Sequence, residues 1–419
     1  MEIKIKAETR LTNESDIQQI PYNHSSLFNN EYNEYLAGLM GGTCYMKDNF
    51  ETLLAQPAEK HISRGKMVAE SGHHSCFGHS HLTLEISGVP KIFAMILNNE
   101  KEYNTSEKSG RYTIIKDPND NENLYDKWLD IFTKEIRKIY KPDNYFTDIK
   151  VKKLAQENAR YLNSIYLPGT SLVYTTSYRQ LNYLAKWMQD QINKPQNAIY
   201  KALKEYFKTF VKFIKDNNLY SESVADDNKG RRFSLFNTAF VKKYYDYTYQ
   251  TNYKCTFVAL ADLQRHRTLN YFIDNNSVKN FVNGKKQDFY IPPIIKNNPE
   301  LKQEWLTDMK KKSVNDIPQG ALINVFESGT FDNFLLKAKE RLCSCVQLEV
   351  LHIVKKTTKE YTDSLSSLHY HAVKKPDQKY YLNLLTTIEP FNKGSKCLAG
   401  YNCKTPCGFA QGIKCTRKI

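Results

Sequence analysis

The feature that most constrains the fold of this chain is a weak internal repeat. The segment LEISGVPKIFAMILNNE, which begins at Leu84, resembles YKCTFVALADLQRHR, which begins at Tyr253. A second pair, LNYLAKWMQDQINKPQNAI from Leu181 and FLLKAKERLCSCVQLEV from Phe334, follows in the same order. Repeated supersecondary units imply two related halves. We therefore predict an α+β fold, in which each half is a mixed or antiparallel sheet packed with long helices.

A change of composition separates the two predicted halves. The stretch 217–232 contains SESVADDNKGRR, which is polar, includes glycine and has no hydrophobic periodicity. These properties are typical of a linker. We predict a first half over 1–216, the linker over 217–232, a second half over 233–390 and a short Cys-rich tail over 391–419.

Hydrophobic periodicity predicts the main elements. MEIKIKAETRL alternates apolar and charged residues, which is typical of a strand, and 82–90 is a second predicted strand. The segment 330–356 is expected to form one long helix that buries one face. Its apolar residues recur at every fourth position: Phe334, Ala338, Leu342, Val346 and Val350. Further helices are expected over 33–46, 60–71, 125–140, 180–188 and 197–214.

The charge of the chain favours an anionic partner. Its 419 residues include 60 Lys and Arg against 45 Asp and Glu, a formal net charge of +15. That excess attracts nucleic acid, anionic lipid or phosphorylated small molecules. No run of 18 apolar residues is present, which excludes a membrane-spanning helix, and the first residues lack a signal-peptide core. We expect a cytoplasmic protein, without a membrane partner, whose nine cysteines are mostly reduced.

A histidine-rich segment is the densest group of potential metal ligands. Residues 73–81 read HHSCFGHSH, and imidazole and thiol are both ligand types that suit zinc. The spacing matches no ordinary zinc module, and the segment contains no acidic residue that could act as a base. A histidine-rich turn before the strand explains the same residues.

Two arginine-containing segments could bind anions. The triplet Arg265–Arg267 reads RHR, and in an extended chain its two guanidiniums project to the same side. They could clamp phosphates or a carboxylate in bidentate fashion, or form the solvated basic end of a buried strand. The segment Ser109–Tyr112 reads SGRY and combines a hydroxyl, a permissive backbone and a guanidinium. It could cradle a phosphate or form an ordinary turn.

Together these motifs resemble the flavin-dependent thymidylate synthases. The family's histidine-containing opening is similar to HHSCFGHSHLTLEI, with His73 and His79 at the two histidine positions and Gly78 in place of a glutamate. The basic triplet expected next is replaced by NNE at 98–100, whereas SGRY is present at 109–112. The later family series is represented by Glu157, Arg160, Pro168, Ser177, Arg179 and Leu181.

The second half shows the complementary pattern. Its RHR triplet is intact at 265–267, but no SxRY segment is recognisable. Arg341 and the segment VQLEV at 346–350 restore a family motif that the first half has lost. We therefore predict a composite site, to which each half contributes residues that the other lacks.

The resemblance implies a reaction and a set of roles. The family transfers a methylene group from methylenetetrahydrofolate to C5 of dUMP, with FAD as hydride carrier and NADPH as reductant. A family homotetramer implies that this duplicated chain acts as a homodimer, a pseudo-tetramer. The implied catalytic residues are Arg341 and His73. The implied cofactor-binding residues are Arg265, His266, Arg267 and Arg179. The implied substrate-binding residues are Ser109, Gly110, Arg111, Tyr112, Arg160 and Asp262.

Two alternatives stay open. Asp262 stands three residues before the triplet, where the family usually has glutamine, and an ionised carboxylate donates no hydrogen bond. It would repel O4 of uracil and suit the amino group of cytosine, so the substrate could be a dCMP-like nucleotide. Asp262 could equally pair with a nearby arginine.

The other alternative is a non-catalytic relative that binds nucleic acid through its tyrosines and lysines, although no nucleic-acid-binding motif supports it.

The tail contains a cluster that the resemblance does not explain. Four thiols lie within 19 residues, with glycine and proline between them: Cys397, Cys403, Cys407 and Cys415. They could hold zinc or an iron–sulfur cluster, which would allow the tail to deliver electrons to the flavin. A reduced tail or a disulfide pair is the alternative.

Overall fold

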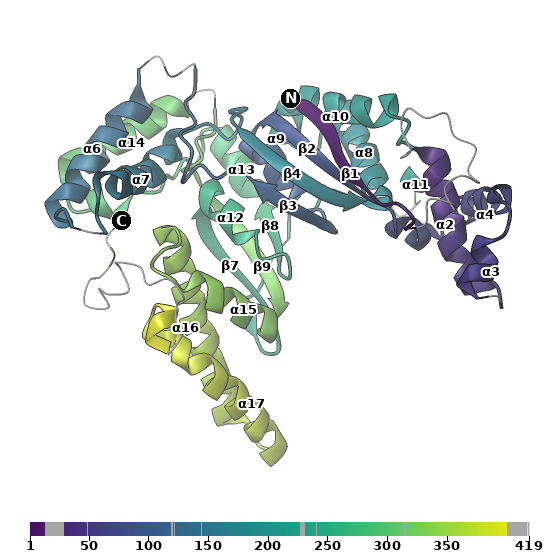
Figure 1. The fold of residues 1–419 in the computed structure, drawn as a ribbon. Helices are drawn as coiled ribbons and strands as arrows, with labels where there is room; N and C mark the ends of the chain where they lie inside the picture. The colour runs from purple at the N-terminus through teal and green to yellow at the C-terminus, as the bar shows by residue number, and fades with distance from the viewer. Residues whose placement is uncertain are drawn as a thin grey trace. The chain divides into compact units, whose positions relative to one another are not determined.

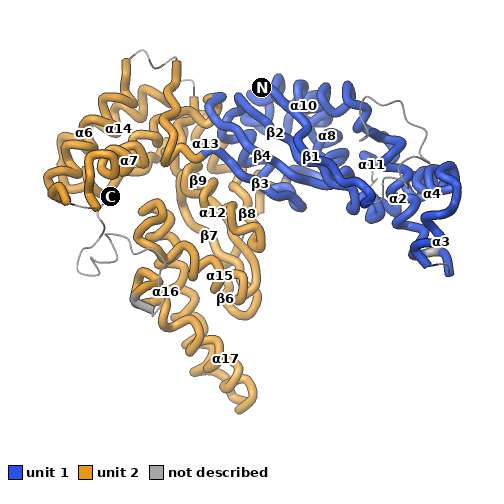
Figure 2. The backbone as a smooth tube through the Cα atoms, viewed as in Figure 1, with its two compact units in different colours: residues 1–108, 168–233 blue, residues 109–167, 234–419 orange. Residues whose placement is uncertain are grey.

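The computed structural model divides the chain into two compact units, which Figure 2 distinguishes by colour. Unit 1 contains residues 1–108 and 168–233, and unit 2 contains residues 109–167 and 234–419. The structure describes residues 1–12, 29–47, 49–118, 120, 122–143, 145–226, 231–239, 241–313, 316–399, 417 and 419.

Unit 1 is built on a four-stranded antiparallel sheet in the order β1-β2-β4-β3. The strands predicted over residues 1–11 and 82–90 are confirmed as β1 and β2. Along β2 the side chains of Leu82, Leu84 and Ile86 are fully buried, so one face of the sheet carries the core. The strands are β1 (Glu2–Glu8), β2 (His81–Val89), β3 (Tyr103–Glu107) and β4 (Thr170–Ser177).

The helices of unit 1 include those predicted over 33–46, 60–71 and 180–188. The helix predicted over 197–214 is divided at Leu203 into two helices, α9 and α10. The helices are α2 (Asn30–Tyr45), α3 (Phe50–Leu54), α4 (Ala58–Glu70), α5 (Lys91–Leu97), α8 (Tyr178–Asn193), α9 (Ala198–Ala202), α10 (Lys204–Asp216) and α11 (Glu222–Ala225). Figure 1 labels all of them except α5.

Two glycines allow α2 and α4 to cross closely. A Cβ at Gly38 would lie 1.8 Å from the carbonyl oxygen of His61, and a Cβ at Gly65 would lie 2.0 Å from that of Glu34. Backbone atoms cannot move aside as a flexible side chain can. Only glycine therefore fits at these two crossing points.

Unit 2 contains a five-stranded sheet in the order β5-β8-β9-β7-β6. The short pair β5 and β8 is parallel, whereas the other pairs are antiparallel. The predicted α+β class is confirmed. The strands are β5 (Phe236–Asn237), β6 (Tyr244–Tyr245), β7 (Thr248–Thr256), β8 (Asn270–Asp274) and β9 (Leu322–Thr330).

The helices of unit 2 include α6, which confirms the helix predicted over 125–140. In both units, no helix of the described residues is long and apolar enough to cross a membrane. The helices are α6 (Leu124–Ile139), α7 (Asp148–Ala159), α12 (Phe257–Leu263), α13 (Asn275–Val282), α14 (Pro299–Lys312), α15 (Phe331–Arg341), α16 (Leu348–His371) and α17 (Lys375–Ile388).

Residues 109–167 precede the predicted linker in the sequence but belong to unit 2. The indole of Trp128 on α6 packs edge-on against that of Trp305 on α14, with ring centroids 4.8 Å apart. The indole N–H of Trp128 also donates to the buried carboxylate of Asp308 at 2.9 Å. These contacts join α6 to α14, so the SGRY segment lies in the same unit as the RHR triplet.

The two sheets share a pattern of connections. In unit 1, β2 leads directly into α5 and β4 into α8; in unit 2, β7 leads directly into α12 and β9 into α15. Strand β4 pairs with β2 and β3, and strand β9 pairs with β7 and β8, all antiparallel. The segments that resemble one another in sequence therefore occupy equivalent places in the two sheets.

One alternative and one prediction around the RHR triplet need correction. The apolar segment before the triplet is helix α12 rather than a buried strand, because a fully buried run has no periodicity that separates the two. The long helix predicted over 330–356 is divided into α15 and α16 by the loop 342–347. In this loop the carbonyls of Ser344, Cys345 and Val346 accept hydrogen bonds from arginine side chains instead of helical N–H groups.

Candidate active site

The SGRY segment is held against the end of α7 within unit 2. The backbone N–H of Arg111 donates to the Ser109 hydroxyl at 3.3 Å, and the Gln156 amide donates to the Gly110 carbonyl at 3.1 Å. A Cβ at Gly110 would meet the Arg160 side chain at 3.8 Å, an ordinary contact. The conformation therefore does not require glycine here, contrary to the expectation of a permissive backbone.

A buried carboxylate links this segment to the second half of the sequence. Glu157 accepts from Nε of Arg111 at 2.8 Å and, through its other oxygen, from Nη2 of Arg417 at 2.8 Å. Nη2 of Arg111 also donates to the Cys345 carbonyl at 2.7 Å. Burial alone would raise the pKa of Glu157, but the guanidiniums of Arg417, Arg111 and Arg160 hold it below its usual range. Glu157 therefore stays ionised and orients both arginines.

A second chain of contacts connects Arg160 to the first turn of α16. Nη2 of Arg160 donates to the Gln347 side chain at 2.7 Å, and Gln347 donates to the Tyr161 hydroxyl at 2.5 Å. Tyr161 in turn donates to Glu349 at 3.0 Å. The hydroxyl and backbone N–H of Thr256, the N-cap of α12, both donate to Glu349 at 2.8 Å. These residues join α7, α12 and α16 around one buried carboxyl.

The carboxyl of Glu349 has an unusual protonation equilibrium. Burial raises its pKa to about 7, even though hydrogen bonds from Thr256 and Tyr161 pull in the other direction. Burial also raises the pKa of the Tyr161 hydroxyl well above its usual value, so this hydroxyl remains a donor. Glu349 is therefore the group of this cluster whose charge changes near neutral pH.

Asp262 and Arg341 lie side by side at the ends of α12 and α15. An oxygen of Asp262 is 3.9 Å from Nη2 of Arg341, which also donates to the Asp262 carbonyl at 3.4 Å. Three buried polar atoms here make no hydrogen bond: the other carboxylate oxygen of Asp262, Nε of Arg341 and Nε2 of His266. Burial, with Arg341 and Lys337 nearby, lowers the pKa of His266 to about 3, so its ring is neutral. Such unsatisfied polar atoms indicate a place for a polar ligand.

The remaining predicted residues of unit 2 are exposed. Arg265 and Arg267 both face solvent on either side of the buried His266. The Tyr112 ring is 66% exposed and has the Arg111 guanidinium 5.8 Å from its centroid. Two exposed guanidiniums therefore lie on either side of the buried ring of His266.

His73 and Arg179 lie in unit 1. His73 is exposed at the end of α4, whereas its neighbour His74 is buried and bonds to the Tyr183 hydroxyl at 2.9 Å. Arg179 donates to the same hydroxyl at 3.2 Å, and Arg231 places its guanidinium 4.1 Å from the Tyr183 centroid. Unit 1 therefore has a cationic cluster of its own around Tyr183.

Neither the predicted cysteine site of the tail nor the alternative site of the histidine-rich segment can be assembled from the described part of the chain. The described residues include the histidines of 73–81, and no group of three or more potential ligands is found among them. Cys397 is half-buried in a short 3₁₀ helix, Lys396–Ala399. The other three predicted ligands, Cys403, Cys407 and Cys415, lie outside the described residues.

A basic pocket of about 510 Å³ lies along α16. It begins at His352, three residues after Glu349, and its other lining residues include Lys355, Lys356 and Lys359. Lys359 is paired with Asp363 at 2.9 Å, which removes part of the positive charge. The pocket can still attract an anionic group.

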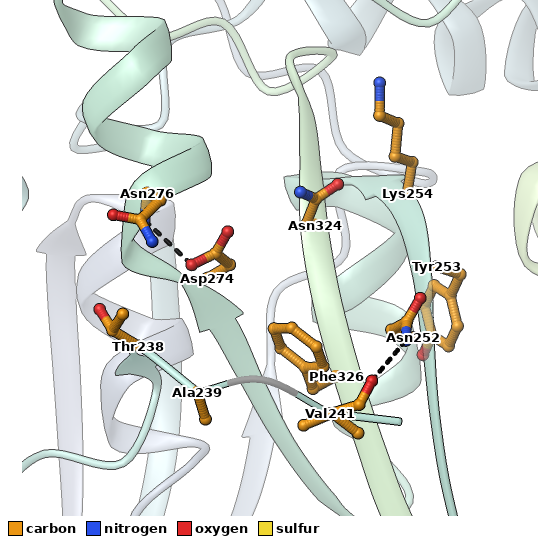
Figure 3. Close-up of a pocket in the computed structure, with 10 residues that line it drawn as sticks. All are labelled: Thr238, Ala239, Val241, Asn252, Tyr253, Lys254, Asp274, Asn276, Asn324 and Phe326. Carbon is orange, nitrogen blue, oxygen red and sulfur yellow. Dashed lines mark hydrogen bonds between the residues drawn. The ribbon is translucent and has the colours of Figure 1, made fainter. Parts of the chain in front are cut away.

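Another pocket, of about 560 Å³, lies on the outer face of the unit 2 sheet (Figure 3). Asn252 and Lys254 of β7 and Asn324 and Phe326 of β9 line it, and the Asn252 amide donates to the Val241 carbonyl at 3.1 Å. None of the predicted site residues is among its lining residues.

Four residues of the site were not predicted to be functional. Gln347 and Glu349 belong to the quoted VQLEV segment, so the family motif could have identified them. Glu157 likewise belongs to the quoted first-half series. Arg417 gave no signal, because a single arginine in a basic tail resembles any other surface cation.

Comparison with known proteins identifies part of the chain. Residues 27–214 match the family model described as thymidylate synthase complementing protein. This segment, which is less than half of the chain, is similar to that family. The family consists of flavin-dependent thymidylate synthases, which are methyltransferase enzymes, so the predicted resemblance and the predicted enzyme class are confirmed.

Among solved structures, the chain is similar to thymidylate synthase X from Helicobacter pylori, whose structure contains FAD and dUMP. The two are 16% identical over 51% of this chain and 100% of that chain, with a TM-score of 0.27. Similarity at this TM-score is too low to define a fold. No curated protein matches the chain.

The family segment covers only part of the predicted site. It contains the SGRY segment, Arg160 and Arg179, but it ends before Arg265 and Arg341. The functional assignments in the second half therefore depend on the geometry of unit 2.

Proposed function

We propose that this chain is a flavin-dependent synthase that transfers a one-carbon unit to C5 of a dUMP-like pyrimidine deoxynucleotide. The observation that carries the proposal is the direct contact between the two halves of the motif set in unit 2. Arg111 and Arg160, which belong to the family segment, bond to Cys345 and Gln347 of the second half at 2.7 Å. Two unrelated losses of motifs would not leave the surviving residues joined in this way.

The nucleotide phosphate is assigned to the SGRY segment. Arg111 offers its guanidinium and Ser109 its hydroxyl, while Arg160 supplies a second positive charge beside Gly110. Guanidiniums bind phosphate in bidentate fashion, so this group fits a phosphomonoester. Glu157 fixes the guanidinium of Arg111 before the ligand arrives, which lowers the entropic cost of binding.

The pyrimidine is assigned to Asp262 and Arg341. Their buried, unsatisfied atoms supply an acceptor and a donor for the polar edge of the base. The guanidinium of Arg341 would stabilise negative charge on the activated ring, and orientation would supply most of the remaining acceleration.

The residues of unit 2 also fit the flavin cofactor. FAD, when bound, would supply the hydride of the reaction. Arg265 and Arg267 would hold its diphosphate, since both are exposed, and the neutral, buried His266 would fix the spacing between them. Methylenetetrahydrofolate as carbon donor and NADPH as reductant complete the proposal, and the basic pocket on α16 would suit the anionic part of either co-substrate.

The test is release of tritium from C5 of labelled dUMP by the purified chain with FAD, NADPH and methylenetetrahydrofolate. Arg111→Lys should raise KM for dUMP at least tenfold, because lysine cannot reproduce bidentate phosphate binding. Arg341→Lys should mainly lower kcat. The matched control is Arg10→Lys, which changes an exposed arginine paired with Glu8 in unit 1. A chain that binds neither FAD nor dUMP would refute the proposal.

The identity of the base is tested separately. If Asp262 selects the amino group of cytosine, the wild type should prefer dCMP and Asp262→Gln should prefer dUMP. Equal turnover of dUMP by the two proteins would show that Asp262 serves only to pair with Arg341.

The remaining features of the proposal concern organisation. We propose that the two halves are diverged copies of one unit and that the chain acts as a homodimer in the cytoplasm. Substitution of His73 or Arg179 tests whether unit 1 contributes to turnover. Metal analysis of the full chain, with and without residues 397–415, tests the tail cysteines as ligands for zinc or an iron–sulfur cluster.

A further inference from the structure

The loop between α15 and α16 carries two cysteines in the sequence Cys343-Ser344-Cys345. Both side chains are partly exposed, and both are thiols rather than disulfide sulfurs. They are not among the predicted tail ligands, although Lys396, the neighbour of Cys397, lies beside the loop, and the proposed reaction uses neither of them. A pair of accessible thiols next to the nucleotide residues requires an explanation of its own.

The backbone brings the two cysteines together. The N–H of Cys345 donates to Sγ of Cys343 at 3.4 Å, so the loop is folded rather than extended at this point. The backbone N–H of Lys396 donates to the Leu342 carbonyl at 2.6 Å, which brings a lysine next to the loop. Cysteines in a folded C-x-C segment can approach closely enough to be bridged.

The surroundings of Cys343 favour its thiolate. A hydrogen bond from the Cys345 thiol, backbone N–H groups and the charge of Lys396 lower the pKa of Cys343 to about 5, although burial opposes them. The thiolate is the nucleophile in thiol–disulfide exchange. Cys76 provides a contrast, because burial raises the pKa of its partly exposed thiol.

The same loop holds the arginines of the candidate active site. The Cys345 carbonyl accepts from Nη2 of Arg111 at 2.7 Å, and the Ser344 carbonyl accepts from Nη1 of Arg417 at 2.6 Å. Both arginines also pair with Glu157. A change in the loop backbone would therefore alter one of the contacts that hold Arg111.

We propose that Cys343 and Cys345 form a redox-active dithiol, which a low-molecular-weight disulfide oxidises and which controls nucleotide binding through the Cys345 carbonyl. In the first step Cys343 attacks one sulfur of the small disulfide, and the other sulfur leaves as a thiol. In the second step Cys345 attacks Sγ of Cys343, and the second small thiol leaves. The protein loses two electrons and two protons, and one small disulfide becomes two thiols. The disulfide removes Sγ of Cys343 as the acceptor of the Cys345 N–H. The loop backbone then shifts, and the Cys345 carbonyl no longer accepts from Arg111.

The dithiol itself can be tested without any assay of catalysis. The full chain is incubated with oxidised glutathione, and its remaining thiols are alkylated. The mass of the proteolytic peptide that contains both cysteines is then measured by mass spectrometry. We expect an internal disulfide, removed by dithiothreitol and absent from Cys343→Ser and Cys345→Ser. Without oxidant, alkylation of Cys343 should be nearly independent of pH above about 6, whereas that of Cys76 should rise roughly tenfold per pH unit. Absence of the disulfide, or zinc held by these thiols, would overturn the assignment.

Control of the site is tested by calorimetric titration with dUMP, and this part depends on the proposed function. The oxidised chain should bind at least roughly tenfold more weakly, since a hydrogen bond to a charged group is worth about 1.5 kcal/mol or more. Cys343→Ser should lose the response, and Cys76→Ser should retain it. Equal affinity of the oxidised and reduced chains would overturn the control. Failure of both forms to bind dUMP would refute the proposed function, while the disulfide result would stand.

Discussion

Replacement of Glu157 by glutamine tests the arrangement of the site most directly. The change preserves the shape of the side chain but removes the charge shared by Arg111 and Arg417, each 2.8 Å away. Removal of one partner from a buried ion pair costs about 3–5 kcal/mol, because the other charges stay buried without compensation. For a unit of this size the loss corresponds to a fall in Tm of roughly 6–20 °C. Urea and thermal denaturation followed by circular dichroism at pH 7 measure it.

The pH dependence and a matched control make this prediction specific. Because the folded-state pKa of Glu157 is depressed, its stabilisation is present above the unfolded pKa of about 4.3 and disappears as the pH falls through the folded value. The two proteins should therefore converge in stability under acidic conditions. Asp363→Asn removes the exposed pair with Lys359 and should cost less than about 1 kcal/mol. A loss for Glu157→Gln no larger than that of this control would refute the reasoning.

Glu349→Gln should remove a pH dependence from the free energy of unfolding. Burial raises the pKa of the Glu349 carboxyl to about 7 in the folded chain. The stabilisation from this group is therefore complete below the unfolded pKa and is lost as the pH rises through about 7. Urea titrations between pH 5 and pH 8 should show the wild type, but not the variant, losing stability from this group. Lys337→Met should lower the free energy of unfolding by about 3–5 kcal/mol, because the fully buried Glu327 loses its cationic partner at 2.6 Å and keeps only hydroxyl donors such as Tyr249. Added Glu327→Gln should recover most of that loss, as denaturation measures. Gly38→Ala should lower the Tm, because its Cβ would lie 1.8 Å from a backbone atom of α4, and the free energy of unfolding should fall by about 1–3 kcal/mol or more. Gly78→Ala is the control and should leave the Tm unchanged, because its Cβ meets no atom within 4 Å.

Periodicity along the sequence determined most of the regular elements of this protein. Strands β1 and β2 follow from alternation of apolar residues, and α2, α4, α6 and α8 follow from helical spacing. These patterns are local, because one buried face is enough to define the period of an element. The short motifs were also sufficient to recognise the family of residues 27–214 and to name Arg111 and Arg160.

Tertiary structure alone decided which residues meet. Apolar spacing continues from Phe334 to Val350, but the helix is interrupted at 342–347, where arginines take the loop carbonyls that helical N–H groups would otherwise bind. The partnership of Glu157 with Arg417 joins positions 260 residues apart and leaves no trace in either local pattern. Buried charge needs a counter-charge, but the sequence does not state which one. Only the fold supplies that partner, and with it the protonation of Glu157 and Glu349 and the position of Arg111.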